Sequence, residues 1–98
     1  MSTETITCVA SFTAKIDQIE NLKNELIALL EPTRNEQGCI SYELHQSIDN
    51  PAIMTMIEKF KNKAAFDFHS SQIYLKALVD KLDVLAEDVD IQTFKTIP

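Results

Sequence analysis

Apolar and polar positions alternate along some segments of this chain and recur at helical spacing along others. Residues 5–13 are rich in β-branched side chains and alternate loosely, which predicts a strand. From Lys15 to about Leu30 the apolar residues recur every three or four positions, which predicts an amphipathic helix. Pro32 is expected to bend or end this helix, because the residue before a proline is pushed out of helical angles.

Two further strands follow a short polar connection from Thr33 to Gly38. Residues 39–47 and 52–60 both alternate, and residues 48–51 (Ile-Asp-Asn-Pro) have the chemistry of a turn, so the two strands are predicted to form a hairpin. On the first strand, one face is expected to carry Ile40, Tyr42 and Leu44. On the second, one face is expected to carry Met54, Met56, Glu58 and Phe60.

The last third of the chain returns to helical spacing and ends in alternation. Asn62 is a good N-cap for a short helix that ends near His69, and Ser70 or Ser71 can cap a second, leucine-rich segment. Residues 88–97 alternate again and predict a closing strand. The order strand, helix, strand, strand, helices, strand predicts an α+β fold, the ferredoxin-like split βαβ with a four-stranded antiparallel sheet.

This architecture covers only one face of the sheet with helices. The uncovered face is predicted to carry Met54, Met56, Phe60 and either Cys8 or Val9, which is more apolar surface than a small monomer usually leaves in water. We therefore expect a homodimer that packs sheet face to sheet face, as a dimeric α/β barrel.

Size and charge narrow the classes of function. Ninety-eight residues are expected to form one domain, residues 1–98. The formal net charge of -6, without a basic cluster, argues against nucleic acid or an anionic membrane as a partner. The chain has neither an apolar stretch long enough to span a bilayer nor the pattern of a signal peptide, so a cytoplasmic location is expected.

The two cysteines do not indicate a metal or redox site. Cys8 and Cys39 lack the spacing of a CxxC motif and have no histidine cluster around them. In the predicted strand order a third strand separates their strands, so both are expected to be free thiols.

Three segments together resemble a known family. These are the strand Gly38–Leu44 (Gly-Cys-Ile-Ser-Tyr-Glu-Leu), the strand end Ile57–Phe60 (Ile-Glu-Lys-Phe) and the helix Ala65–His69 (Ala-Phe-Asp-Phe-His). In order and spacing they are similar to the antibiotic biosynthesis monooxygenase domain, which includes quinol monooxygenases. The resemblance implies a dimeric α+β barrel that oxidises phenolic or quinol-type molecules with dioxygen, with no cofactor: no metal, flavin or haem.

The chemistry implied by this resemblance needs a dry pocket, a base and stabilisation of developing charge. His69 is the candidate base, and Glu58 is expected to orient or polarise it. The chain has Phe60 where many members have Trp, and Tyr74 where many have a second His. Haem-degrading relatives have Trp at the position of His69 and a haem ligand where this chain has Val79, which argues against haem.

Each candidate also has a simpler interpretation. His69 could be a helix-end histidine bonded to a local carbonyl, and Glu58 could be a strand-edge carboxylate paired with a lysine. Tyr42 and Tyr74 either bind a substrate oxygen or pack in the core with the hydroxyl at its boundary. The apolar candidates for substrate binding, which could equally be core or dimer contacts, are Met54, Met56 and Phe60.

Two alternatives to oxidation stay open. One group within the family isomerises a phosphorylated autoinducer, and such a ligand would require some of the nearby lysines Lys59, Lys61, Lys63 and Lys76. The other alternative is a dimer that binds a ligand without chemistry, since fold does not fix function. In each case the expected partner is a small aromatic or oxygenated metabolite.

Overall fold

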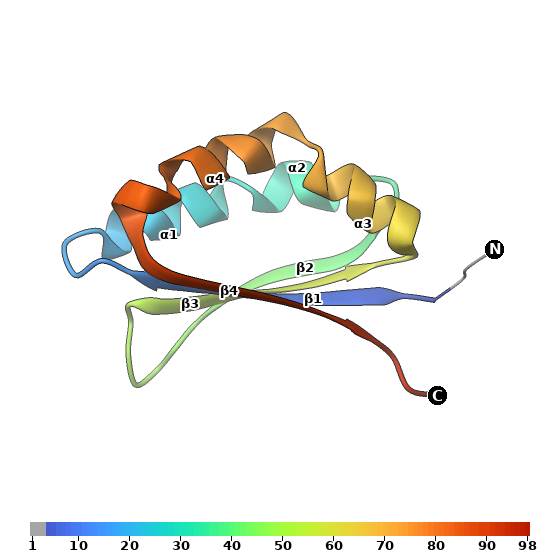
Figure 1. The fold of residues 1–98 in the computed structure, drawn as a ribbon, viewed down its shortest axis with the longest axis horizontal. Coiled ribbons are helices and arrows are strands. Elements are labelled where there is room, and N and C mark those ends of the chain that lie inside the picture. The colour runs from blue at the N-terminus through green and yellow to red at the C-terminus, as the bar shows by residue number, and fades with distance from the viewer. Residues whose placement is uncertain (1–3) are drawn as a thin grey trace.

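A layer of helices covers one face of a four-stranded antiparallel sheet in the computed structural model, which describes residues 4–98 (Figure 1). Among these residues no helix has the length and apolar character needed to cross a bilayer. In chain order the elements are β1 (Ile6–Ala14), α1 (Ile19–Ile27), α2 (Leu30–Arg34), β2 (Cys39–Gln46), β3 (Ile53–Phe60), α3 (Lys63–Ser70), α4 (Ile73–Leu85) and β4 (Ala86–Lys95).

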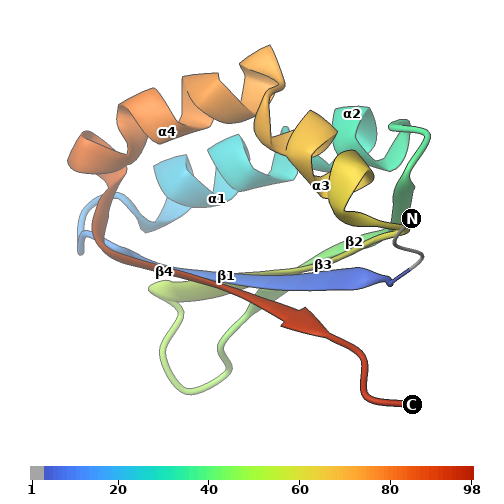
Figure 2. The same ribbon diagram turned by 45° about the vertical axis from the view of Figure 1, so that its right-hand side comes forward.

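The strands lie in the order β2-β3-β1-β4, which is the predicted ferredoxin-like α+β topology. All the helices lie on the same side of this sheet, and within the described residues nothing covers its other side (Figure 2). Because β3 lies between β1 and β2, Cys8 and Cys39 are on strands that are not neighbours, and both are free thiols as predicted.

The prediction of which residues face away from the helices was wrong. Met54, Met56, Phe60 and Cys8 are at most 2% exposed and belong to the side covered by helices. Alternation shows which residues share a face, but it does not show which face the helices cover. The strand register instead places the following residues on the open face: Thr7, Val9, Thr55, Ile57 and Phe94.

A β-bulge in β2 corrects a second prediction. The register with β3 shifts between Cys39, which pairs with Phe60, and Ser41, which pairs with Lys59. The extra residue at the bulge turns Cys39 toward the core and leaves Ile40 56% exposed, so Ile40 does not share a face with Tyr42.

The first helical region also differs from its prediction. Residues 15–18 form a turn, Ile16 is 92% exposed, and α1 begins only at Ile19. Pro32 does not end a helix but lies in the first turn of α2, where its missing N–H removes no helical hydrogen bond. Helical spacing alone therefore located the helix but not the break before Leu30.

The two helices after β3 begin differently. Asn62 caps α3 as predicted, and its side-chain oxygen accepts a hydrogen bond from the backbone N–H of Ala65 at 2.9 Å. The prediction of a serine cap for α4 was wrong, because its N-cap is Gln72 and no side chain caps it. Ser70 and Ser71 instead donate to carbonyls of the preceding α3 turn.

Gly38, the chain's only glycine, lies where the loop before β2 passes under α3. A Cβ built on Gly38 would lie 2.2 Å from the Cβ of Ala65 and 3.3 Å from its Cα. Real atoms do not approach so closely, so even a methyl group would force the loop and the helix apart. This contact fixes the distance between α3 and the loop that carries Glu36.

The close approach at Gly38 yields a test of the packing. We expect Gly38→Ala to lower the free energy of unfolding by about 1 to 3 kcal/mol through overpacking. Ala65→Gly alone should cost about 1 kcal/mol because of glycine's low helix propensity. In a double-mutant cycle followed by urea unfolding, the double variant should be more stable than the two single losses predict, because Ala65→Gly removes the clash. Strict additivity would contradict this account.

Candidate functional site

A mostly apolar cavity of about 130 Å³ lies between the sheet and the helices. β1 and β3 contribute its floor, and α1, α3 and α4 contribute its walls. We call it the inner cavity. The titratable side chains that line it are Cys8, Tyr42, Glu58 and His69.

His69 projects from the last turn of α3 toward the sheet and is 2% exposed. Its ring lies 4.9 Å from the ring of Phe60, tilted by 30°, and 5.4 Å from the ring of Tyr42 in an edge-on arrangement. The Asn62 cap fixes where α3 starts, and helical spacing then turns Phe66 and His69 to the same side, both onto the inner cavity. Aromatic packing therefore holds the imidazole in one plane.

Two buried carboxylates flank the two ring nitrogens of His69. Nδ1 lies 3.0 Å from Oε2 of Glu36, which is a hydrogen bond. Nε2 lies 3.7 Å from Oε1 of Glu58, which is within ion-pair range but beyond a normal hydrogen bond. The side chains of both glutamates are at most 7% exposed. The simpler interpretation of His69, a bond to a local carbonyl, does not describe these contacts.

Glu58 is predisposed to be neutral. Burial, followed by the negative charge of Glu36, raises its pKa to about 8, although a hydrogen bond with Cys8 opposes this shift. Burial likewise raises the pKa of the Cys8 thiol to about 12, so Cys8 stays protonated beside it. At neutral pH the inner cavity thus holds a carboxylic acid next to an imidazole.

The structure distributes the other predicted site residues unevenly. Tyr42 and Met56 line the inner cavity, and burial raises the pKa of Tyr42, which keeps its hydroxyl protonated. Met54 and Phe60 are fully buried in the core and do not line the cavity, although Phe60 packs on His69.

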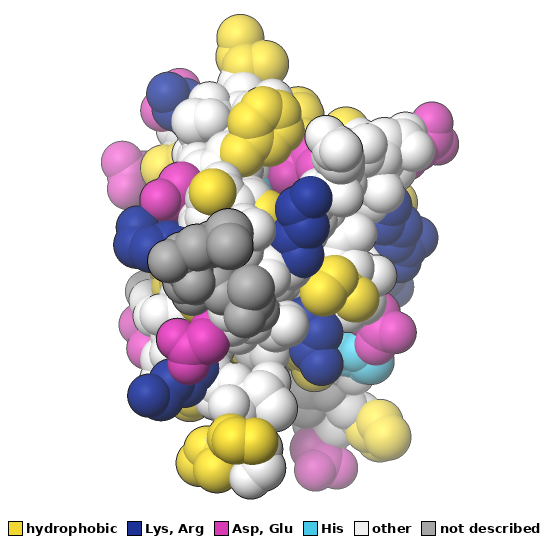
Figure 3. Space-filling model, turned by 90° about the vertical axis from the view of Figure 1, so that its right-hand side faces the viewer, with side chains coloured by type: hydrophobic (Ala, Val, Ile, Leu, Met, Phe, Trp, Pro, Cys, Tyr) yellow, Lys and Arg dark blue, Asp and Glu magenta, His cyan; other side chains and the backbone are white. Residues whose placement is uncertain are grey.

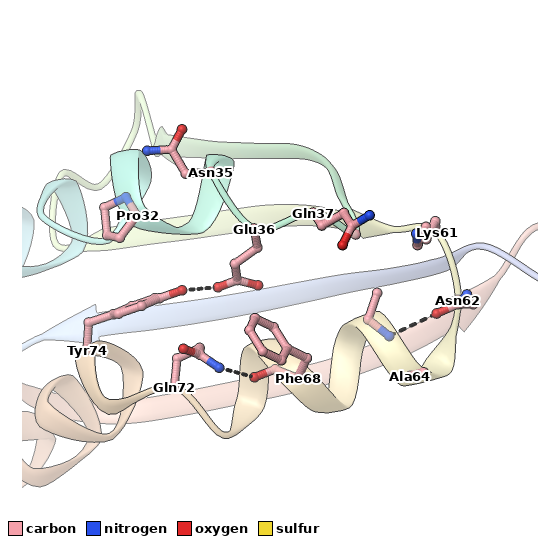
Figure 4. Close-up of a pocket in the computed structure, with 12 residues that line it drawn as sticks. Pro32, Asn35, Glu36, Gln37, Lys61, Asn62, Ala64, Phe68, Gln72 and Tyr74 are labelled. Atoms are coloured by element: carbon pink, nitrogen blue, oxygen red, sulfur yellow. Dashed lines mark hydrogen bonds between the residues drawn. The ribbon is translucent and has the colours of Figure 1, made fainter.

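Tyr74 lies in a second, more open hollow of about 470 Å³, which we call the outer pocket. Its hydroxyl donates a hydrogen bond to Oε2 of Glu36, the oxygen that also contacts His69 (Figure 4). Burial and this bond to Glu36 raise the pKa of Tyr74, so it remains a donor. Tyr74 therefore contacts the site through Glu36, from the outer pocket rather than from the inner cavity.

Glu36 is the residue that the analysis of the sequence missed. It is 8% exposed, lines the outer pocket and accepts hydrogen bonds from both His69 and Tyr74. The available signal was its position two residues before the chain's only glycine. A polar loop gives no reason to expect burial, which here follows from the close approach of Gly38 to α3.

No group of three or more His, Cys, Asp or Glu side chains within residues 4–98 is arranged to hold a metal ion. The polar centre of the site is the series of contacts from Glu58 through His69 and Glu36 to Tyr74.

Residues 5–81 match the model of the antibiotic biosynthesis monooxygenase family. An uncharacterised Synechocystis protein is 36% identical over 78 residues, which are 74% of this chain and 53% of that protein. A Mycobacterium tuberculosis protein whose name proposes a monooxygenase is 33% identical over 68% of this chain and 65% of its own length. The matched segment therefore spans between half and two thirds of these two relatives.

Solved structures agree with the fold over nearly the whole chain. A Shewanella oneidensis protein has a TM-score of 0.93 at 36% identity, covering 97% of this chain and 93% of its own. A Pseudomonas aeruginosa protein has a TM-score of 0.92 at 32% identity, covering 100% and 98%. Because the family model matches most of this chain, the chain belongs to the antibiotic biosynthesis monooxygenase family.

Proposed function

We propose that this protein is a cofactor-independent monooxygenase that oxidises a phenol or quinol with dioxygen in the inner cavity. The observation that carries the proposal is the placement of His69, which lines a mostly apolar cavity with Nε2 toward Glu58 while Nδ1 is bonded to Glu36. Membership of the family and the monooxygenase names of relatives support the same class of reaction.

The proposed reaction begins with proton transfer. Nε2 of His69 takes the proton of the phenol hydroxyl, and the electron-rich phenolate reduces dioxygen at a ring carbon. One oxygen atom becomes the new carbonyl of a quinone. The other leaves as water with two hydrogens, one from the hydroxyl and one from that ring carbon. Neutral Glu58 and Tyr42 are the donors placed to stabilise the anionic oxygen.

The size of the inner cavity favours a single ring. Its volume is about 130 Å³, close to the roughly 150 Å³ of an engineered apolar cavity that binds benzene. Met56 and the leucines of α4 supply apolar walls, which exclude water and let the phenolate meet oxygen. We infer a monocyclic phenol or hydroquinone as the substrate class.

The isomerase alternative receives less support from the lysines. Lys61 lines the outer pocket, whereas Lys63 is paired with Asp67 at 2.8 Å, and Lys59 lies on the β3 face away from the helices. Figure 3 shows the molecule from the end of the sheet where β1 begins. Basic side chains there are interspersed with acidic and apolar ones rather than gathered into one anion site.

We also propose that the open sheet face packs on a second copy of the chain. Ile57 at 40% and Phe94 at 47% exposure lie on this face with Val9, and their cross-strand neighbours include Thr7 and the polar Glu43. Such a surface fits an isologous contact, in which the same patch serves both subunits.

Removal of the proposed base should abolish oxidation. For His69→Ala we expect oxygen uptake with monocyclic hydroquinones to fall by about 100-fold or more. The exposed His45 provides a matched control, and His45→Ala should retain full rates. Bicyclic quinols should react poorly with the unchanged protein. Full activity of a folded His69→Ala variant would contradict the assignment, and product formation under strict anaerobiosis would favour isomerisation.

The raised pKa of Glu58 makes stability depend on pH. The folded state holds the Glu58 proton up to about pH 8, whereas the unfolded chain releases it near the ordinary glutamate pKa of 4.5. Stability should therefore be greatest below that lower value and fall as pH rises through 8. From pH 5 to pH 9 we expect the free energy of unfolding, measured in urea, to fall by about 3 to 5 kcal/mol more in the unmodified protein than in Glu58→Gln at matched concentrations. Parallel pH profiles for the two proteins would show that Glu58 is not perturbed.

A charge on the open face should separate the subunits. We expect Ile57→Asp to shift the chain from dimer to monomer in sedimentation velocity, because an unpaired carboxylate would be buried at the contact. Ile16→Asp, at a 92% exposed position away from the sheet, should leave the dimer intact. A monomeric unmodified chain would contradict the proposed assembly.

A further inference from the structure

His69 separates two hollows that share no lining residue. The inner cavity includes His69 and Glu58 in its lining, and the outer pocket includes Glu36 and Tyr74. Among the described residues, the only hydrogen bond between side chains that joins the two linings is the 3.0 Å contact from Nδ1 of His69 to Oε2 of Glu36. A proton can therefore pass between the hollows through the imidazole ring.

Glu36 is unusual because one of its carboxylate oxygens is fully satisfied and the other has no partner. Oε2 accepts from Tyr74 and His69, while Oε1 is buried and has no hydrogen-bond partner among the described residues. Figure 4 shows the carboxylate at the centre of the outer pocket, with the Tyr74 hydroxyl at one side of it. Leaving such an atom unpaired costs stability. Because Glu36 lines the outer pocket, a proton that its carboxylate accepts from Nδ1 lies at the edge of that pocket.

The contact with Glu36 also fixes the tautomer of His69. An ionised carboxylate can only accept hydrogen bonds, so the neutral imidazole must carry its hydrogen on Nδ1. Nε2 is then left without a hydrogen and faces the inner cavity. Packing of Phe60 and Tyr42 against the ring opposes a flip that would exchange the two nitrogens.

We propose that Glu36, held by the Tyr74 hydroxyl, is a positioning residue that sets the tautomer of His69 and relays the substrate proton to the outer pocket. This inference rests on the proposed function and extends it. In the relay the phenol O–H bond breaks as the Nε2–H bond forms, and the Nδ1–H bond breaks as an O–H bond forms on Glu36. His69 remains neutral overall, and the path reverses when the proton returns to the oxygen that leaves as water.

The first test of the relay is chemical rescue. We expect Glu36→Ala to lower kcat/KM for a hydroquinone by about 100-fold or more, and added formate to restore a large part of the loss, because the outer pocket can admit it beside Nδ1. Glu43→Ala serves as a control, since Glu43 is an exposed carboxylate beside the exposed His45. It should keep its rate with and without formate. Tyr74→Phe, which retains Glu36, should lose less than Glu36→Ala.

The second test does not depend on turnover. Nitrogen-15 NMR of the His69 ring should show hydrogen on Nδ1 in the unmodified protein, and Glu36→Ala should remove this preference. Glu36→Gln, which keeps the side-chain shape, provides a variant if Glu36→Ala fails to fold, and it should be inactive because an amide cannot take the proton. A ring with hydrogen on Nε2 in the unmodified protein, or full activity of a folded Glu36→Gln, would overturn the relay. If the unmodified protein oxidises no phenol, the proposed function fails, and the tautomer alone decides the inference.

Discussion

The hydrogen bond between His69 and Glu36 is the interaction on which the site depends. It joins the end of α3 to the loop before β2, two segments 33 positions apart in sequence. The close approach of Gly38 to Ala65 brings that loop against α3, next to His69. Once Glu36 is buried next to His69, its charge helps to raise the pKa of the other carboxyl group, Glu58. This contact therefore helps to orient the imidazole and adds to the burial that raises the pKa of Glu58.

The two glutamates differ in their surroundings more than in their burial. Glu36 receives two hydrogen bonds on one oxygen, whereas Glu58 lies against an apolar cavity with a hydrogen bond to Cys8 and a longer contact to His69. Burial against the apolar cavity raises the pKa of Glu58 and so lets the site hold an acid beside a base at the same pH. The protein would thus supply proton transfer and a dry cavity, and the aromatic substrate would supply the electrons.

Much of the fold could be predicted from the sequence, because alternation and helical spacing are local signals. The strand order, the Asn62 cap and the shared face of Met56 and Glu58 all follow from them. The bulge that turns Ile40 outward and the face that the helices cover depend on tertiary contacts, which a local pattern does not encode. His69 was identified as a candidate because the segment Ala65–His69 resembles a motif of the family. Glu36 lies in a polar loop, and only the packing at Gly38 shows that it is buried.

The central claim is that His69 bears hydrogen on Nδ1 between an ionised Glu36 and a protonated Glu58. Neutron diffraction from deuterated crystals near pH 6.5 tests it most directly, because it locates each deuterium. The account predicts deuterium on Nδ1 of His69, on one oxygen of Glu58 and on the Tyr74 hydroxyl, with none on Glu36. Deuterium on Glu36 together with a bare Glu58, or a neutral His69 that carries deuterium only on Nε2, would contradict it.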